Sequence, residues 1–159
     1  MQADMEAVPE LFERIALDFS KRFGRRYNAV ETIRDKGDDL ALIATATLAG
    51  TAKACVQQAQ DVGLIKIRLF RPFPIGPLRK AVQGFKRGVI IDRNLSPGAG
   101  GIFAQEIKAS LYGTEEQIPL VSVIGGLGGV DVTVDHLEAL VRRVREQTVM
   151  DEEIYWMEP

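Results

Sequence analysis

The stretch Asp92-Arg-Asn-Leu-Ser-Pro-Gly-Ala-Gly-Gly101 carries the residue types of a ligand-binding loop. Glycine-rich loops that follow a strand can present backbone amides to a phosphate, and an aspartate at the strand end could orient a bound ligand. The dinucleotide fingerprint G-x-G-x-x-G is absent, however, because Phe103 and Asp131 stand where its last glycine belongs in the two glycine-rich loops. Neither loop has a Walker lysine. We therefore favour a strand-to-helix turn over a phosphate site.

In this interpretation the loop residues have structural tasks. Gly98, Gly100 and Gly101 permit tight backbone conformations. The three residues before them, Asp92, Arg93 and Asn94, tie the loop down through hydrogen bonds to neighbouring amides or a pairing of Asp92 with Arg93.

Other reactive side chains do not form a catalytic group in the sequence. Ser96 is not part of a G-x-S-x-G elbow, which argues against a hydrolase. His136 is expected on the surface and Cys55 on the apolar face of a helix. With one cysteine and one histidine, the chain cannot build a Cys/His zinc site or an iron–sulfur cluster of its own.

The composition is that of an ordinary globular domain. The 159 residues are 46% hydrophobic and 26% charged, with a net charge of −2, which gives no general attraction to nucleic acid or to an anionic membrane. No apolar run reaches the roughly 18 residues of a membrane span. A single cysteine suits a reducing cytoplasm.

Buried strands alternate with amphipathic helices along the chain. Expected strands are 27–33, 40–45, 64–70, 88–91 and 120–124. Expected helices are 9–24, one reaching residue 62, one from Pro77 to near Gly84, 102–111, and a last one capped by Thr133. This order predicts an α/β fold with a mostly parallel sheet and helices on both faces. Its carboxyl edge would carry three glycine-bearing loops, 48–51, 94–101 and 125–129.

One domain is expected over residues 1–146, followed by an acidic tail over 147–159. The tail ends in four large apolar residues, Ile154, Tyr155, Trp156 and Met157. We expect them to dock on the domain or on a partner, because such a group is unfavourable in water.

Five stretches together are distinctive: "FGRRYNAVE" (23–31), "LAGTAKACV" (48–56), "IKIRLFRPFP" (65–74), "IIDRNLSPGAGG" (90–101) and "GGLGGVDVT" (125–133). In this order the chain resembles the second domain of the α subunit of pyruvate:ferredoxin oxidoreductases and related 2-oxoacid:ferredoxin oxidoreductases. The resemblance implies a transketolase C-terminal-like fold, a three-layer α/β/α sandwich. Its five strands have the order 1-3-2-4-5, and strand 1 is antiparallel.

The family's reaction interconverts a 2-oxoacid plus CoA with an acyl-CoA plus CO2, and electrons pass to ferredoxin. The resemblance implies no cofactor on this chain. Thiamine diphosphate, iron–sulfur clusters and CoA are expected on partner subunits, namely a pyrimidine-domain subunit, a diphosphate-binding β subunit, and γ and ferredoxin-like subunits. Ferredoxin would be an indirect partner. An arginine often follows the Gly-Leu-Gly-Gly stretch in relatives, and Val130 stands there in this chain.

Two functions compete at this point. The first is a non-catalytic subunit or split domain of a multisubunit 2-oxoacid (pyruvate) oxidoreductase, which organises the thiamine-dependent complex. Its docking loops would be 71–77, 94–100 and 125–130, with Phe73, Ile75, Leu95 and Leu127 as apolar contacts. The alternative is a free-standing α/β module that binds a nucleotide or CoA through its glycine loops.

Overall fold

A computed structural model describes residues 1–33, 39–146 and 154–157 of the chain. Its central element is a six-stranded sheet of order β1-β3-β2-β4-β5-β6. The strands are β1 (Val30–Ile33), β2 (Leu40–Thr45), β3 (Val62–Ile67), β4 (Arg87–Asp92), β5 (Leu120–Ile124) and β6 (Ile154–Trp156). Only β1 runs antiparallel, with Val30 opposite Ile67 of β3. The expected order 1-3-2-4-5 and the antiparallel first strand are confirmed, and the structure adds a sixth strand.

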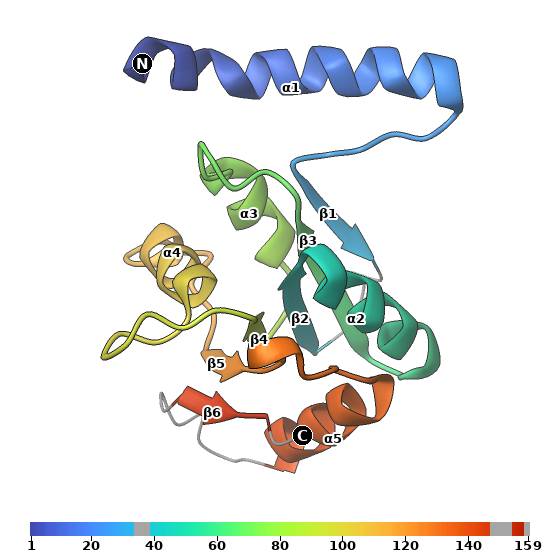
Figure 1. The fold of residues 1–159 in the computed structure, drawn as a ribbon, viewed down its shortest axis with the longest axis vertical. Coiled ribbons are helices and arrows are strands. Elements are labelled where there is room, and N and C mark those ends of the chain that lie inside the picture. The colour runs from blue at the N-terminus through green and yellow to red at the C-terminus, as the bar shows by residue number, and fades with distance from the viewer. Residues whose placement is uncertain (34–38, 147–153, 158–159) are drawn as a thin grey trace.

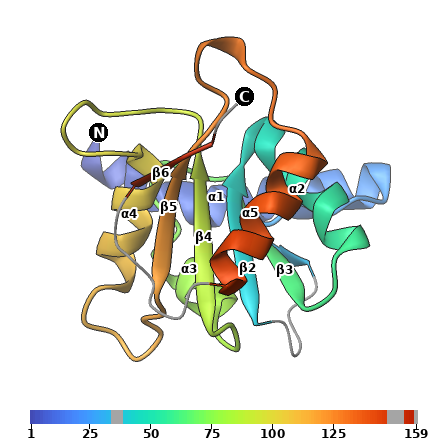
Figure 2. The same cartoon turned by 90° about the horizontal axis from the view of Figure 1, so that it is seen from below.

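Helices cover both faces of the sheet (Figures 1 and 2). They are α1 (Gln2–Phe23), α2 (Ala46–Gln58), α3 (Ile75–Val82), α4 (Ile102–Leu111) and α5 (Val134–Glu146), with a short 3-10 turn η1 (Leu127–Gly129). The parallel strands are buried on both sides, which is why they read as continuous apolar runs such as Leu40–Ala44.

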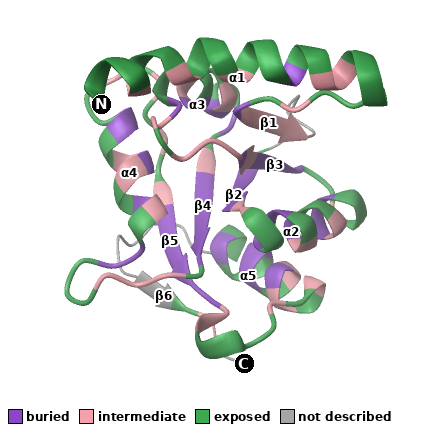
Figure 3. Ribbon diagram, turned by 45° about the horizontal axis from the view of Figure 1, so that its top comes forward, coloured by how far each residue is buried: buried purple, intermediate pink, exposed green. Residues whose placement is uncertain are grey.

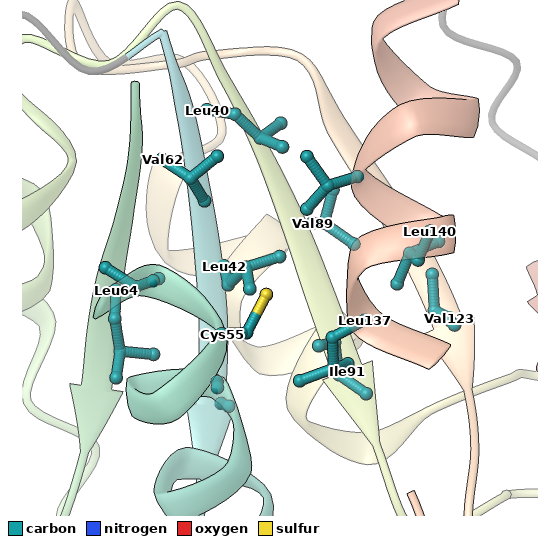
Figure 4. Close-up of a cluster of buried hydrophobic side chains, with 14 of the residues drawn as sticks. Leu40, Leu42, Cys55, Val62, Leu64, Val89, Ile91, Val123, Leu137 and Leu140 are labelled. Atoms are coloured by element: carbon teal, nitrogen blue, oxygen red, sulfur yellow. The ribbon is translucent and has the colours of Figure 1, made fainter. Parts of the chain in front are cut away.

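The two faces of the sheet form separate cores. On one face Leu42, Leu64 and Val89 pack beneath α2 and α5, around the buried Cys55 (Figure 4). On the other face Ile43 and Ile90 pack beneath α3 and α4. Neighbouring residues of a strand thus belong to opposite cores, as the two-residue period of a strand requires.

The first helix is longer than expected and lies at the margin of the fold (Figures 1 and 3). It begins at Gln2 rather than at Pro9, which lies inside the helix, and among its residues only Ala16 is buried. Phe19 attaches its end to the domain through Tyr27, with ring centroids 5.5 Å apart. Gly24, in the left-handed conformation, ends the helix as expected.

Part of the tail docks on the domain. Ile154–Trp156 pair in parallel with Ser122–Ile124 of β5, and the Met157 amide donates to the Ile124 carbonyl at 2.8 Å. Met157 also packs against the α2/α5 core. The expected docking is confirmed for the main chain of residues 154–157 and for the side chain of Met157. The other residues of the expected tail, 147–153 and 158–159, lie outside the described residues, and the division at residue 146 stays a prediction.

Candidate functional site

Asp92 is the last residue of β4 and its side chain is completely buried. Oδ1 accepts hydrogen bonds from the Phe103 amide at 3.1 Å and from the Asn94 side-chain amide at 3.0 Å, and Oδ2 accepts from the Ala104 amide at 3.0 Å. Phe103 and Ala104 belong to the first turn of α4, whose N-cap residue Gly101 has no side chain to cap it. Asp92 therefore caps α4 across the loop.

Asn94 completes this cap. Its Oδ1 accepts from the Ile102 amide at 2.7 Å, so Asp92 and Asn94 together satisfy the first three amides of α4. Burial raises the pKa of the Asp92 carboxyl above its ordinary value, and the hydrogen bonds from Ala104, Phe103 and Asn94 offset this only in part. Each oxygen of this carboxylate is engaged in holding the strand-to-helix turn.

The loop between these two residues and α4 is a tight hairpin. Ser96 and Gly100 form a β-bridge, with the Ser96 amide 2.8 Å from the Gly100 carbonyl oxygen. Gly98 and Gly100 have φ angles of 78° and 92°, which glycine adopts without steric cost. Gly101 has an ordinary φ of −71°, so the expectation that it permits an unusual backbone conformation is wrong. What requires glycine there is the close approach of the Asp92 carboxylate.

Arg93 points away from Asp92 and joins three segments at the carboxyl edge of the sheet. Its Nη2 donates to the carbonyl oxygens of Gly126 and Val130 at 3.1 and 3.3 Å, and Nη1 donates to Thr47 Oγ1 at 3.2 Å. No ion pair between Asp92 and Arg93 is needed to hold the loop. The Val130 contact runs through its main chain, so it does not depend on which side chain stands at that position.

The carboxyl-edge loops gather at one end of the sheet. In Figure 2 the chain after β4 and the chain after β5 rise on the same side, and α2 starts beside them. Leu95 and Leu127 are half-buried in these loops. The expected third glycine-bearing loop, 48–51, is not a loop, because α2 begins at Ala46 and includes all four of its residues. Ala46 makes the turn in its place, with a φ of 47°.

The segment 68–77 is fastened to α4 rather than to Arg93. Phe70 and Phe103 have ring centroids 4.7 Å apart, and Arg71 lies 2.6 Å from Glu106. Phe73 packs into the α3/α4 core, whereas Ile75 is exposed beside α1. The sequence did not indicate the roles of Phe70, Phe103 and Glu106, although Phe70 lies in the motif "RLFRPFP" that contributed to the family resemblance.

Beside this segment lies a hollow at the ends of β2 and β3. Its lining includes Lys66, Arg68, Phe70 and Phe103, together with Thr45, Ala46 and Ile67. Arg68 already pairs with Glu31 at 2.5 Å and lies over the Tyr27 ring. Lys66 is therefore the cation at this hollow for which the structure shows no ion pair among the described residues.

The remaining reactive residues have structural partners. The Thr133 hydroxyl accepts from the His136 amide and His136 Nδ1 accepts from the Thr133 amide, both at 3.3 Å, which forms a reciprocal cap of α5. Thr133 is thus the expected cap, and His136 is half-buried rather than fully on the surface. Burial, and secondarily Glu138, raises the pKa of the Cys55 thiol and keeps it protonated.

The reactive side chains of this chain do not fit an iron–sulfur cluster, which is a redox group that the resemblance implies for the complex. A [4Fe–4S] cluster takes about four cysteine thiolates, and the sequence has one cysteine, which is buried as a thiol. Within the described ranges, no group of three His, Cys, Asp or Glu side chains is placed to hold a metal ion. Among the residues that the structure describes, the buried carboxylate at the carboxyl edge is that of Asp92, and it already accepts three hydrogen bonds.

Comparison with known proteins identifies the family. Residues 38–137 match the pyruvate:ferredoxin oxidoreductase core domain II. The chain belongs to this family. It is 34% identical over 143 residues to pyruvate synthase subunit PorA of Methanothermobacter thermautotrophicus, with 87% of this chain and 36% of that subunit covered. It is 33% identical over 159 residues to ketoisovalerate oxidoreductase subunit VorA of Pyrococcus horikoshii, covering 95% of this chain and 40% of that subunit.

A solved structure confirms the fold. A 2-oxoglutarate:ferredoxin oxidoreductase from Magnetococcus marinus, with 2-oxoglutarate, coenzyme A and succinyl-CoA bound, matches at a TM-score of 0.54 and 18% identity. The match covers 81% of this chain and 21% of that chain. The chain thus spans well under half the length of the relatives it matches. None of the helices within the described residues is long and apolar enough to cross a bilayer.

Proposed function

We propose that this chain is the second-domain component of a cytoplasmic, multisubunit 2-oxoacid:ferredoxin oxidoreductase, and that it organises the complex rather than performing the chemistry. Thiamine diphosphate, iron–sulfur clusters and CoA would lie on the partner subunits. The observation that carries the proposal is the clamp formed by Arg93. It joins the chain after β4, the chain after β5 and the start of α2 into one surface.

A surface fixed in this way suits docking. Loops that are already held in place lose little conformational entropy when a partner binds. Leu95 and Leu127 supply half-buried apolar side chains on the two clamped loops, and Gly98 and Gly100 keep the backbone of the first loop tight. Asp92 and Asn94 are committed to the cap of α4, so this edge of the sheet presents shape and apolar surface rather than a free acid or base.

Reconstitution tests the proposal. The partner subunits are assayed with and without this chain for pyruvate- or 2-oxoglutarate-dependent reduction of a viologen dye. We expect activity only with the chain present, and a loss of activity and of co-purification for Leu127→Asp. Tyr112→Asp is the matched control, because Tyr112 is exposed at the far end of α4. Full activity without the chain, or turnover by the chain alone with added thiamine diphosphate, refutes the proposal.

A second function is a module that binds a nucleotide or CoA. The hollow beside Lys66, Phe70 and Phe103 favours it, because a cation and aromatic rings at the start of a helix suit a phosphate-bearing ligand. Calorimetric titration of the isolated chain with coenzyme A and with adenine nucleotides decides between the two. Micromolar binding that Lys66→Met weakens at least tenfold would replace the organising role with this one.

A further inference from the structure

The first helix leaves an apolar strip uncovered. The domain covers the side of α1 that carries Phe12, Ala16 and Phe19. Leu11 and Ile15, one turn apart on a neighbouring side of the helix, are 42% and 58% exposed. Figure 3 shows α1 exposed along most of its length, with no other element beyond it. The strip is therefore open to a second molecule.

The strip is the centre of a longer seam. Residues 4, 8, 11, 15, 18 and 22 follow one another at alternating spacings of four and three, which is the a/d spacing of a coiled coil. Asp4 and Arg22 stand at the two ends of this seam, with side chains that are 85% and 69% exposed. Within the chain, Asp4 pairs with the Met1 ammonium at 2.8 Å and Arg22 pairs with Asp18 at 3.1 Å, and both pairs lie in solvent. The seam thus has an acid at one end, two large apolar residues in the middle and a base at the other end.

The seam is complementary, in charge and in apolar contacts, to a second copy of the same seam that runs in the opposite direction. If two seams run antiparallel about a midpoint at residue 13, Leu11 of each copy meets Ile15 of the other. Asp4 then meets Arg22, and this contact occurs twice. Val8 meets Asp18, whose carboxylate remains 3.1 Å from Arg22 of its own helix and so keeps a cation beside it. A contact in which residue i meets j and j meets i is the signature of a twofold dimer.

We propose that α1 is a dimerisation helix and that the seam Asp4–Leu11–Ile15–Arg22 packs antiparallel against the same seam of a second copy of this chain. The occupant is a second copy because the seam's own charges are matched by its reversal. A contact made by one helix pair is smaller than a standard stable interface of roughly 800 Å² per partner, so we expect a weak dimer. This inference does not depend on the proposed role in the oxidoreductase.

The experiment is sedimentation equilibrium of the full chain and its variants. Asp4→Arg alone places two arginines at each end of the seam, and Arg22→Asp alone places two aspartates there. We expect each single variant to dimerise at least tenfold more weakly than the wild type. An equimolar mixture of the two restores both opposite-charge contacts, so we expect its heterodimer to regain an affinity within threefold of the wild type.

A matched pair of apolar positions separates the seam from the rest of α1. Ile15→Lys should weaken dimerisation at least tenfold. Leu17→Lys should leave it unchanged, because Leu17 is 47% exposed on the opposite side of the helix. A chain that stays monomeric up to about 0.5 mM overturns the proposal, since even a weak dimer would be populated there. A dimer that Ile15→Lys does not weaken, or a mixture that shows no recovery, also overturns it.

Discussion

Oδ2 of Asp92 occupies the space that a side chain on Gly101 would need: a Cβ at residue 101 would stand 2.1 Å from this oxygen. The two residues are nine positions apart in the sequence, and they meet because the loop returns to β4 before α4 begins. Gly101 and Asp92 therefore act together. Because Gly101 has no side chain, the Asp92 carboxylate can reach the amides of Phe103 and Ala104.

Gly101→Ala should destabilise the fold by at least about 2 kcal/mol, because either the carboxylate moves off the helix amides or the loop shifts. Gly98→Ala meets no atom within 4 Å but has a φ of 78°, so it should cost about 1 kcal/mol. Gly50→Ala, in the middle of α2 and in open space, should be neutral or stabilising by up to about 1 kcal/mol. Urea unfolding of the three variants measures this order, and equal losses for Gly101 and Gly98 would contradict the role given to Asp92.

The sequence predicted the framework better than the site. Buried strands such as Leu40–Thr45 can be recognised in the sequence as apolar runs, and the family resemblance implied the order of the strands in the sheet. The capping of α4 by Asp92 is a contact between residues 11 and 12 positions apart, across a loop whose path no local pattern specifies. The same limit applies to Gly101. The sequence shows that a glycine stands there, but only the structure shows that it is required by the nearby Asp92 carboxylate and not by a positive φ angle.

The two ends of the fold show the same distinction. The apolar spacing from Leu11 to Phe23 predicted a helix over 9–24, whereas α1 begins at Gln2 and Pro9 lies inside it, where its ring removes one amide donor from the helix. Apolar residues in the tail predicted docking, yet pairing with β5 required a free strand edge, which is a property of the sheet and not of the tail.

The pH dependence of stability should separate Asp92 from Asp39. Because burial raises the pKa of Asp92, the folded state holds this proton more tightly than the unfolded state. Its contribution to stability is therefore lost as the pH rises from the ordinary carboxyl value through the raised one. The hydrogen bond from Lys86, and then its charge, lowers the pKa of Asp39, so its contribution is present above the ordinary value and is lost as the pH falls.

Unfolding of Asp92→Asn and Asp39→Asn between pH 3 and pH 7 tests these opposite signs. Relative to the wild type, the destabilisation by Asp92→Asn should be larger in acid than at neutral pH. The effect of Asp39→Asn should be small and should grow as the pH rises, since the pair with Lys86 is exposed. Parallel pH profiles for the two variants would show that the burial of Asp92 does not control its titration.

Arg93→Met should free the loop after β5 without unfolding the domain. The substitution removes the donors to the carbonyl groups of Gly126 and Val130, but Arg93 itself is exposed and outside both cores. Hydrogen exchange at residues 125–132 should accelerate at least tenfold while exchange in β2 and β4 stays within the error of the wild type. Arg93→Lys keeps the charge but lacks the planar guanidinium that reaches both carbonyl groups. Its exchange rates at residues 125–132 should therefore lie between those of the wild type and of Arg93→Met.

The docked end of the tail should depend on Met157 more than on Trp156. Met157 packs against the α2/α5 core and would contact a side chain at Gly125, whereas Trp156 is 55% exposed. Met157→Ala should therefore cost about 1–2 kcal/mol and Trp156→Ala less than about 0.5 kcal/mol.

Fluorescence of Trp156, the only tryptophan, reports the docking directly. Its emission maximum should lie between those of buried and free indole in the wild type, and it should move to the solvent value in Met157→Asp, because releasing Met157 frees the end of β6 from β5. An emission maximum of free indole in the wild type would mean that β6 does not stay on the sheet in solution.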